Sequence, residues 1–131
     1  MRINTTGEVI ITDTTNVPGT IYSTEVASTI EIRSGYVTIS NINIRTEADH
    51  AITVAAYQND ATCVLDNVTV NGEVYAINGV NNTAIIEIIS GTFTPATNIE
   101  DFIASTSTIS VTDNTATVTS GDTSGHSAPT P

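Results

Sequence analysis

The sequence predicts an all-β solenoid, in which short strands wind into coils that stack on one another. The main sign is a repeat, because residues 30–38 recur at residues 86–94 with the same alternation of apolar and polar positions. Shorter relatives follow the first copy at residues 38–44 and 64–70. The unit of strand, small polar pair and strand recurs at an interval of about 25 residues, which is typical of coils that bury their apolar face only by stacking.

Composition supports this fold class. The chain has 131 residues, enough for one domain. Thr, Ile, Val, Asn and Ser dominate, and these residues favour strands and turns. Hydrophobic residues make up 39% of the chain but aromatic residues only 5%. The core must therefore be filled by aliphatic side chains, as a narrow solenoid requires.

Each coil is expected to contain three short strands joined by sharp corners. Asn41, Asn67 and Gly91 are predicted to hold equivalent corners, since Asn and Gly tolerate the left-handed backbone region. In this alignment Phe93 points inward only if a bulge absorbs a slip of one residue. The repeat length predicts about four coils between residues 8 and 94. The side chains expected to point inward are Ile30, Ile32, Val37, Ile39, Ile42, Ile44, Ile52, Val54, Val68, Val70, Ile86, Ile88 and Phe93.

After Pro95 the periodicity changes, and residues 95–119 are predicted to cap the open end of the coils. A capping box from Thr97 to Glu100 starts a short helix, with Phe102 as a plug. Turn residues at positions 113 and 114 then join two strands into a hairpin. The expected organisation is coils over 1–94, cap over 95–119 and a flexible Ser/Thr/Gly/Pro-rich tail over 120–131.

Charge excludes several functions. The chain carries three Arg, no Lys and fourteen acidic residues, for a net charge of −11. Nucleic acid and anionic membranes are therefore not expected partners, because both need a basic surface. Neither a Gly-rich Asp repeat nor EF-hand spacing is present, so no metal or cofactor is expected.

No catalytic residues are predicted, and the chain is not expected to be an enzyme. Cys63 is the single cysteine and lies in an apolar stretch, where a buried core residue fits. The carboxylate pairs Glu47 with Asp49 and Asp60 with Asp66 lie in or beside predicted turns, where acidic residues are expected anyway. Hydrolysis of a glycoside would need two carboxylates about 5–10 Å apart across a groove.

The segments Thr-Ile-Ser-Asn-Ile-Asn-Ile (38–44) and Leu-Asp-Asn-Val-Thr-Val (65–70) resemble the right-handed parallel β-helix of the pectate-lyase-like superfamily. The resemblance covers roughly residues 8–94 and implies right-handed coils. Residues 88–94, 111–114 and 117–119 are similar to the ends of β-helical repeats in phage appendages and gut-bacterial surface proteins. Lyases of the superfamily use basic residues and often calcium, and its hydrolases use clustered Asp; this chain shows neither set.

The leading functional hypothesis is a non-enzymatic virion surface protein, such as a phage capsid decoration or fibre component made in the host cytoplasm. It rests on the acidic surface, the absence of a visible signal peptide in residues 1–7 and the lack of a catalytic constellation. The partner would be a capsid or other virion protein. The alternative is an extracellular, cell-surface adhesin of a bacterium that binds glycans through loops 45–50 and 78–82.

Self-association is also expected, because so short a solenoid has two ends to cover. We expect a homotrimer, and tyrosine is enriched at interfaces. The candidate contact residues are Tyr22, Tyr36, Tyr57 and Tyr75.

A third functional class is an ice-binding solenoid, which would need a flat array of threonine. Residues 106–108 and 115–119 supply outward threonines, but the sequence places them in the predicted cap and not in aligned coils. This position argues against an array.

Overall fold

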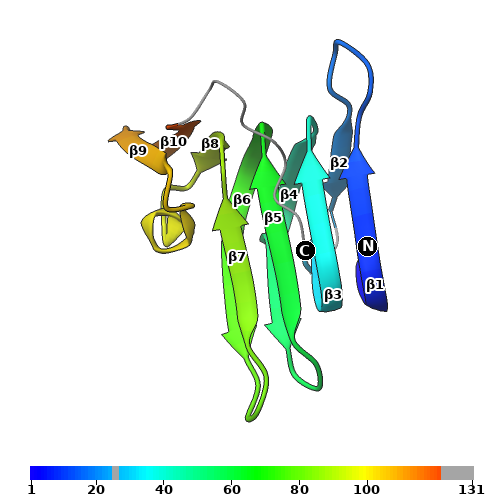
Figure 1. Ribbon diagram of the computed structural model, residues 1–131. Helices are drawn as coiled ribbons and strands as arrows, with labels where there is room; N and C mark the ends of the chain where they lie inside the picture. The colour runs from blue at the N-terminus through cyan, green and yellow to red at the C-terminus, as the bar shows by residue number, and fades with distance from the viewer. Residues whose placement is uncertain (25–26, 122–131) are drawn as a thin grey trace.

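The computed structural model describes residues 1–24 and 27–121, with backbone only at residues 48 and 49. Strands hold 66% of the described residues and helix 3%. Figure 1 shows the elements in chain order. They are β1 (Arg2–Thr12), β2 (Thr20–Ser23), β3 (Ile30–Ser40), β4 (Asn43–Ala56), β5 (Ala61–Asp66), β6 (Val68–Asn78), β7 (Ala84–Ile88), β8 (Gly91–Thr94), the 3-10 helix η1 (Ile99–Phe102), β9 (Ser107–Thr112) and β10 (Thr115–Ser120).

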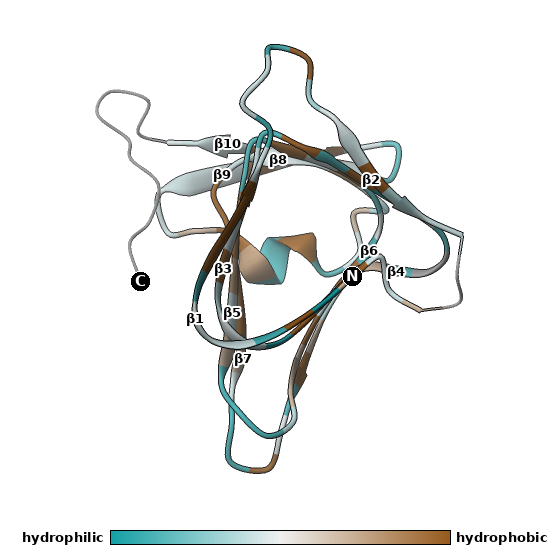
Figure 2. Ribbon diagram, turned by 90° about the vertical axis from the view of Figure 1, so that its right-hand side faces the viewer, coloured by the Kyte–Doolittle hydropathy of each residue, from teal (hydrophilic) through white to brown (hydrophobic). Residues whose placement is uncertain are grey.

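The strands wind around a three-sided interior, which Figure 2 shows end-on. The first face stacks the second halves of β1 and β3 on β5 and β7. The second face stacks β2, the first halves of β4 and β6, and β8. The third face stacks the first halves of β1 and β3 on the second halves of β4 and β6. All of these pairings are parallel, so the predicted parallel β-solenoid is confirmed.

The coils shorten along the chain. On the first face Ile11 pairs with Ile39, Ile39 with Leu65, and Leu65 with Ile88, so each register step is shorter than the one before it. The solenoid has about three turns. The prediction of about four coils is therefore too high by about one.

The core is an aliphatic column inside the coils. Every side chain predicted to point inward is at most 6% exposed except Ile42, which is partly buried against the same core. Ile42 lies at a corner just before β4 begins, where the alternation of the strand is interrupted. Full burial of one Ile or Val side chain contributes about 1.5–3 kcal/mol, so these ladders are the main source of stability.

The predicted alignment of the last corner is wrong by one residue. Gly91 pairs with Val68, so Ser90 lies opposite Asn67, and the Asn67 N–H donates to the Ser90 carbonyl over 3.0 Å. The register step is the same from β5 to β7 as it is from β6 to β8. Phe93 therefore points inward without a bulge, because the shortening lies earlier, at the corner between the second and third faces, where residues 45–50 of β4 lie against residues 71–73 of β6.

The C-terminal segment closes one end of the solenoid. Figure 2 shows η1 lying across the middle of the three faces. Ile99 of η1 is fully buried, and Ile103 forms a parallel bridge with Ile88. Strand β10 then pairs antiparallel with β8, and β9 pairs with β10, so the hairpin extends the second face.

Two details of this segment differ from prediction. The helix is a single 3-10 turn, and no side-chain bond caps it. Its N-cap is Asn98, with a left-handed φ of 67°, so the predicted capping box at Thr97 is wrong. Ile99 fills the end of the core, while Phe102 is only partly buried.

The predicted hairpin is present, with a tight turn at Asp113 (φ 51°) and Asn114 (φ 64°). Left-handed conformations at both positions are what a two-residue hairpin turn requires. The predicted flexible tail begins inside β10, which extends to Ser120, and residues 122–131 lie outside the described part of the chain.

Candidate functional site

The corner between the first and second faces carries a polar ladder. Asn41 and Asn67 both have a left-handed φ of 55°, and the Asn67 side-chain amide donates to Asn41. In the next layer Ser90 Oγ accepts from the Asn67 N–H over 2.9 Å and donates to Asp66 Oδ1 over 2.8 Å. These bonds satisfy the corner internally, so its role is structural. Ser90, and not Gly91, is the third member.

The four candidate contact tyrosines do not form one patch. Tyr22 lies on the second face with the Arg45 guanidinium 4.1 Å from its ring centroid. Tyr75 lies on the third face and stacks on His50 at 4.9 Å. Tyr57 lies beyond β4 with Arg33 5.4 Å from its ring. Tyr36 lies on the first face and packs against a small cluster of Val64, Ile89 and Ala104.

The two loops proposed for glycan binding lie at different corners. Residues 45–50 belong to β4, where the register with β6 shifts between the second and third faces. Residues 78–82 begin at the last residue of β6, between the third and first faces, and are closed by a 3.0 Å bond from Gly79 N–H to the Asn82 carbonyl. The structure therefore does not bring them together into one site.

Asp60 and Asp66, one of the two candidate carboxylate pairs, do not form an acid–base pair. Asp60 and Asp66 flank the length of β5, which puts them about 20 Å apart at the rise of a strand. Asp60 Oδ1 accepts from the Thr83 N–H over 2.9 Å, and Asp66 bonds Ser90. Of the other pair, the Asp49 side chain lies outside what the structure describes. Distances of about 5–10 Å would be needed for glycoside hydrolysis.

Cys63 is a core residue, as predicted. Its side chain is fully buried, and this burial raises the pKa of the thiol to about 12. A protonated, buried thiol is not a nucleophile.

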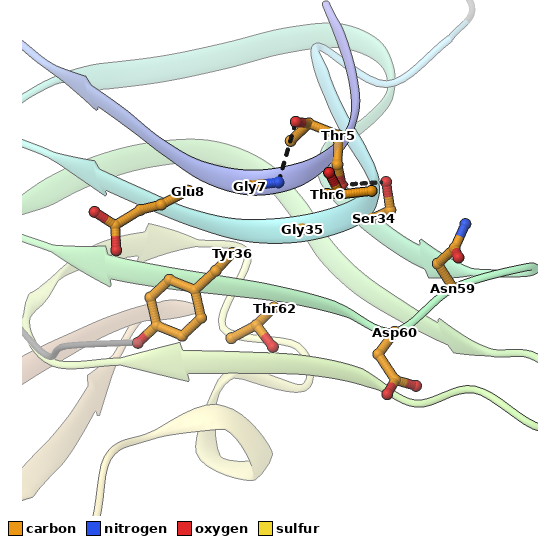
Figure 3. Close-up of a pocket in the computed structure, with 10 residues that line it drawn as sticks. All are labelled: Thr5, Thr6, Gly7, Glu8, Ser34, Gly35, Tyr36, Asn59, Asp60 and Thr62. Carbon is orange, nitrogen blue, oxygen red and sulfur yellow. Dashed lines mark hydrogen bonds between the residues drawn. The ribbon is translucent and has the colours of Figure 1, made fainter.

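An open groove of about 480 Å³ lies at the corner between the third and first faces. Figure 3 shows Glu8, Tyr36 and Thr62 on neighbouring strands, with Asp60 at one side. Burial raises the pKa of Tyr36, and the charges of Glu87 and Glu8 raise it further. The groove offers the hydroxyl oxygens of Tyr36 and Thr62 and the carboxylate oxygens of Glu8 and Asp60. Its lining is Thr5, Thr6, Gly7, Glu8, Ser34, Gly35, Tyr36, Asn59, Asp60 and Thr62.

The second face carries a feature that the sequence interpretation missed. Thr117 of β10 pairs with Thr92 of β8, and Thr92 pairs with Thr69 of β6. The threonines assigned to a separate cap therefore lie in register with those of the coils. The alternation of Thr115, Thr117 and Thr119 was the available signal, but the partner strand of β10 could not be inferred from it.

We call this surface the threonine face. Its first row crosses the whole sheet, and its second row covers the four strands nearest the capped end. The first row is Thr20, Asn43, Thr69, Thr92, Thr117 and Ser110, and the second row is Asn71, Thr94, Thr115 and Thr112.

Among the described residues, no group of three or more His, Cys, Asp or Glu is placed to hold a metal ion. Within the same part of the chain, no helix is long and apolar enough to cross a membrane. Comparison with protein-family models, curated proteins and solved structures gives no match.

Proposed function

We infer that the protein is a non-enzymatic structural component of a virion surface, a capsid decoration or fibre protein that docks on a capsid protein through its N-terminal end. The observation that supports this function most is the difference between the two ends of the solenoid. One end is closed by η1 and the hairpin, whereas the other presents its core.

The first layer of the core is only partly covered. Val9 and Ile11 of β1 are partly exposed, while Val37 and Ile39, their partners in the next layer, are fully buried. Ile21 of β2 is likewise partly exposed above the fully buried Ile44. An apolar layer at the end of a solenoid is stabilised when another surface covers it.

The backbone at this end is also open. Within residues 1–24 and 27–121, no strand pairs with the outer edges of β1 and β2. Such edges present unpaired N–H and C=O groups that readily accept a strand of another chain. A capsid protein that supplies an edge strand and apolar side chains would satisfy both features of this end.

The rest of the surface favours a rigid structural protein over an enzyme. The net charge of −11 favours solubility. The arginines serve internal contacts, since Arg2 and Arg33 both bond Glu31 and Arg45 lies over Tyr22. The bacterial adhesin alternative has less support, because its two proposed glycan loops lie at different corners.

The docking end can be tested with a matched pair of substitutions. Ile10 on β1 is 63% exposed and Val111 on β9 is 57% exposed, so glutamate at either site leaves the core intact. The protein is mixed with purified capsid shells and bound copies are counted after sedimentation. We expect saturable, stoichiometric binding that Ile10→Glu abolishes and Val111→Glu retains.

Absence of binding to shells, or equal loss with both variants, would contradict this function. We also expect the free protein to be a homotrimer, at three times its 13.7 kDa mass in light scattering. A monomer mass across a wide concentration range would exclude the trimer without excluding the docking end.

A further inference from the structure

The threonine face is an uncharged, periodic surface on an acidic protein. Its two rows contain only Thr, Ser and Asn, although the chain has a net charge of −11. The charged exceptions lie at its margins, where Arg45 continues the second row toward β2 and Asp113 forms the hairpin tip. The pairing of β8 with β10 makes this surface continuous from the coils onto the hairpin.

The side chains of the face are held in fixed positions. On β6 and β10 the outward residues alternate with buried ones: Val68 and Val70 flank Thr69, and Ala116 and Val118 flank Thr117. Threonine itself has a stiff χ1. The rows therefore repeat with the period of a sheet, about 4.8 Å between strands and about 6.7 Å between alternate residues.

Two occupants are disfavoured by size and chemistry. The part of the face over β6, β8, β10 and β9 covers about 300 Å², at the spacings of a sheet. A stable protein partner buries about 800 Å² on each side, so a second copy has too little area here. Small-ligand sites are lined mainly by apolar and aromatic side chains, whereas these rows contain no aromatic side chain over the same four strands.

We propose that the threonine face binds the surface of ice. The rows of threonine are periodic, and so is the surface of ice. Each threonine hydroxyl can hydrogen-bond a water of the ice lattice, and each threonine methyl group is removed from liquid water when ice binds. Fixing a liquid water costs up to about 2 kcal/mol of entropy, but waters in an ice lattice are already fixed. The absence of charge matters because charged groups hold liquid hydration shells strongly.

The experiment measures thermal hysteresis and the shape of a single ice crystal grown in the full-length protein. We expect faceted crystals and a freezing point held below the melting point. Thr92→Lys and Thr117→Lys place a charge in the first row, and each should abolish both effects. Thr62→Lys is the matched control, because Thr62 is also an outward threonine within a sheet but lies on the first face. It should retain both effects.

Circular dichroism establishes that each variant is folded. Several results would overturn the proposal: no hysteresis with the folded wild-type protein, full hysteresis in Thr92→Lys, or equal loss in Thr62→Lys. Binding to crystalline cellulose or chitin without binding to ice would assign the face to a polysaccharide instead. A wild-type dimer that Thr92→Lys dissociates would assign it to a second copy. Capsid docking uses the outer edges of β1 and β2, whereas Thr92 and Thr117 lie on β8 and β10 near the capped end, so either proposal can fail without the other.

Discussion

The Asn67 side-chain amide donates to Asn41 Oδ1 over 2.8 Å, and both residues have a left-handed φ of 55°. The two asparagines occupy the same corner of successive coils. Each asparagine adopts a left-handed backbone conformation that is unfavourable for most other residues. Its side chain also forms a hydrogen bond with the neighbouring coil. At this corner the same two residues set the turn between strands and connect one coil to the next.

Substitution of Asn67 should separate these two contributions. Asn67→Gly keeps the left-handed backbone and loses the side-chain bond, so we expect about 1 kcal/mol of lost unfolding free energy. Asn67→Ala also forces alanine into the left-handed region and should lose about 2–3 kcal/mol. Urea denaturation measures both values. Equal effects of the two variants would contradict a conformational role for Asn67.

Gly91 should tolerate no side chain. A Cβ at Gly91 would lie 2.5 Å from the Val68 carbonyl oxygen, and its φ of 149° disfavours other residues. Gly7 is the control, because its nearest atom would be Thr5 Oγ1 at 3.9 Å. We expect Gly91→Ala to lower the midpoint of thermal unfolding strongly and Gly7→Ala to leave it nearly unchanged. Similar midpoints for both variants would exclude the close approach of the two coils.

The core ladder predicts a large effect of Leu65→Ala. Leu65 is fully buried between Ile39 and Ile88, so truncation should cost about 2–5 kcal/mol through lost burial and a cavity. Ile85→Ala on the neighbouring strand provides the comparison, since Ile85 points outward and is 47% exposed. Its change in unfolding free energy should be within about 0.5 kcal/mol.

Stability should depend on the ionisation of Glu31. Burial, the largest single influence, raises its pKa, but bonds from Arg33 and Arg2 outweigh it and hold the pKa below the usual value. A lowered pKa stabilises the fold above the carboxyl's ordinary range, and this stabilisation is lost as the pH falls through the folded pKa. The difference in unfolding free energy between wild type and Glu31→Gln should therefore be largest near neutrality and shrink in acid. A constant difference across pH would contradict the ion pairs.

The thiol of Cys63 should react only after unfolding. It is fully buried and its pKa is raised to about 12, so little thiolate exists at pH 8. Labelling with a chromogenic disulfide reagent should be slow in the native protein and fast in denaturant. Rapid labelling of the native protein would show that the core opens readily at this layer.

The sequence by itself determined which side chains of each strand are buried and which residues form two of the corners. Alternation of Ile and Val with polar residues marked the buried ladders, and all but Ile42 of the expected inward side chains are fully buried or nearly so. Asn41 and Asn67 were found from their chemistry, because few other residues accept a left-handed corner. These features depend on neighbours within a short stretch of chain, which a repeat displays directly.

Only the tertiary structure decided how the layers align. The register step shortens along the first face, from the pairing of β1 with β3 to that of β5 with β7, because the corners between the faces differ in length from coil to coil. That change moved Ser90 into the corner predicted for Gly91. It was also pairing between distant strands that set Thr117 beside Thr92 and made a continuous face from coil and hairpin. Register between strands depends on link length and on packing across the core, and neither is encoded in the periodicity of a single segment.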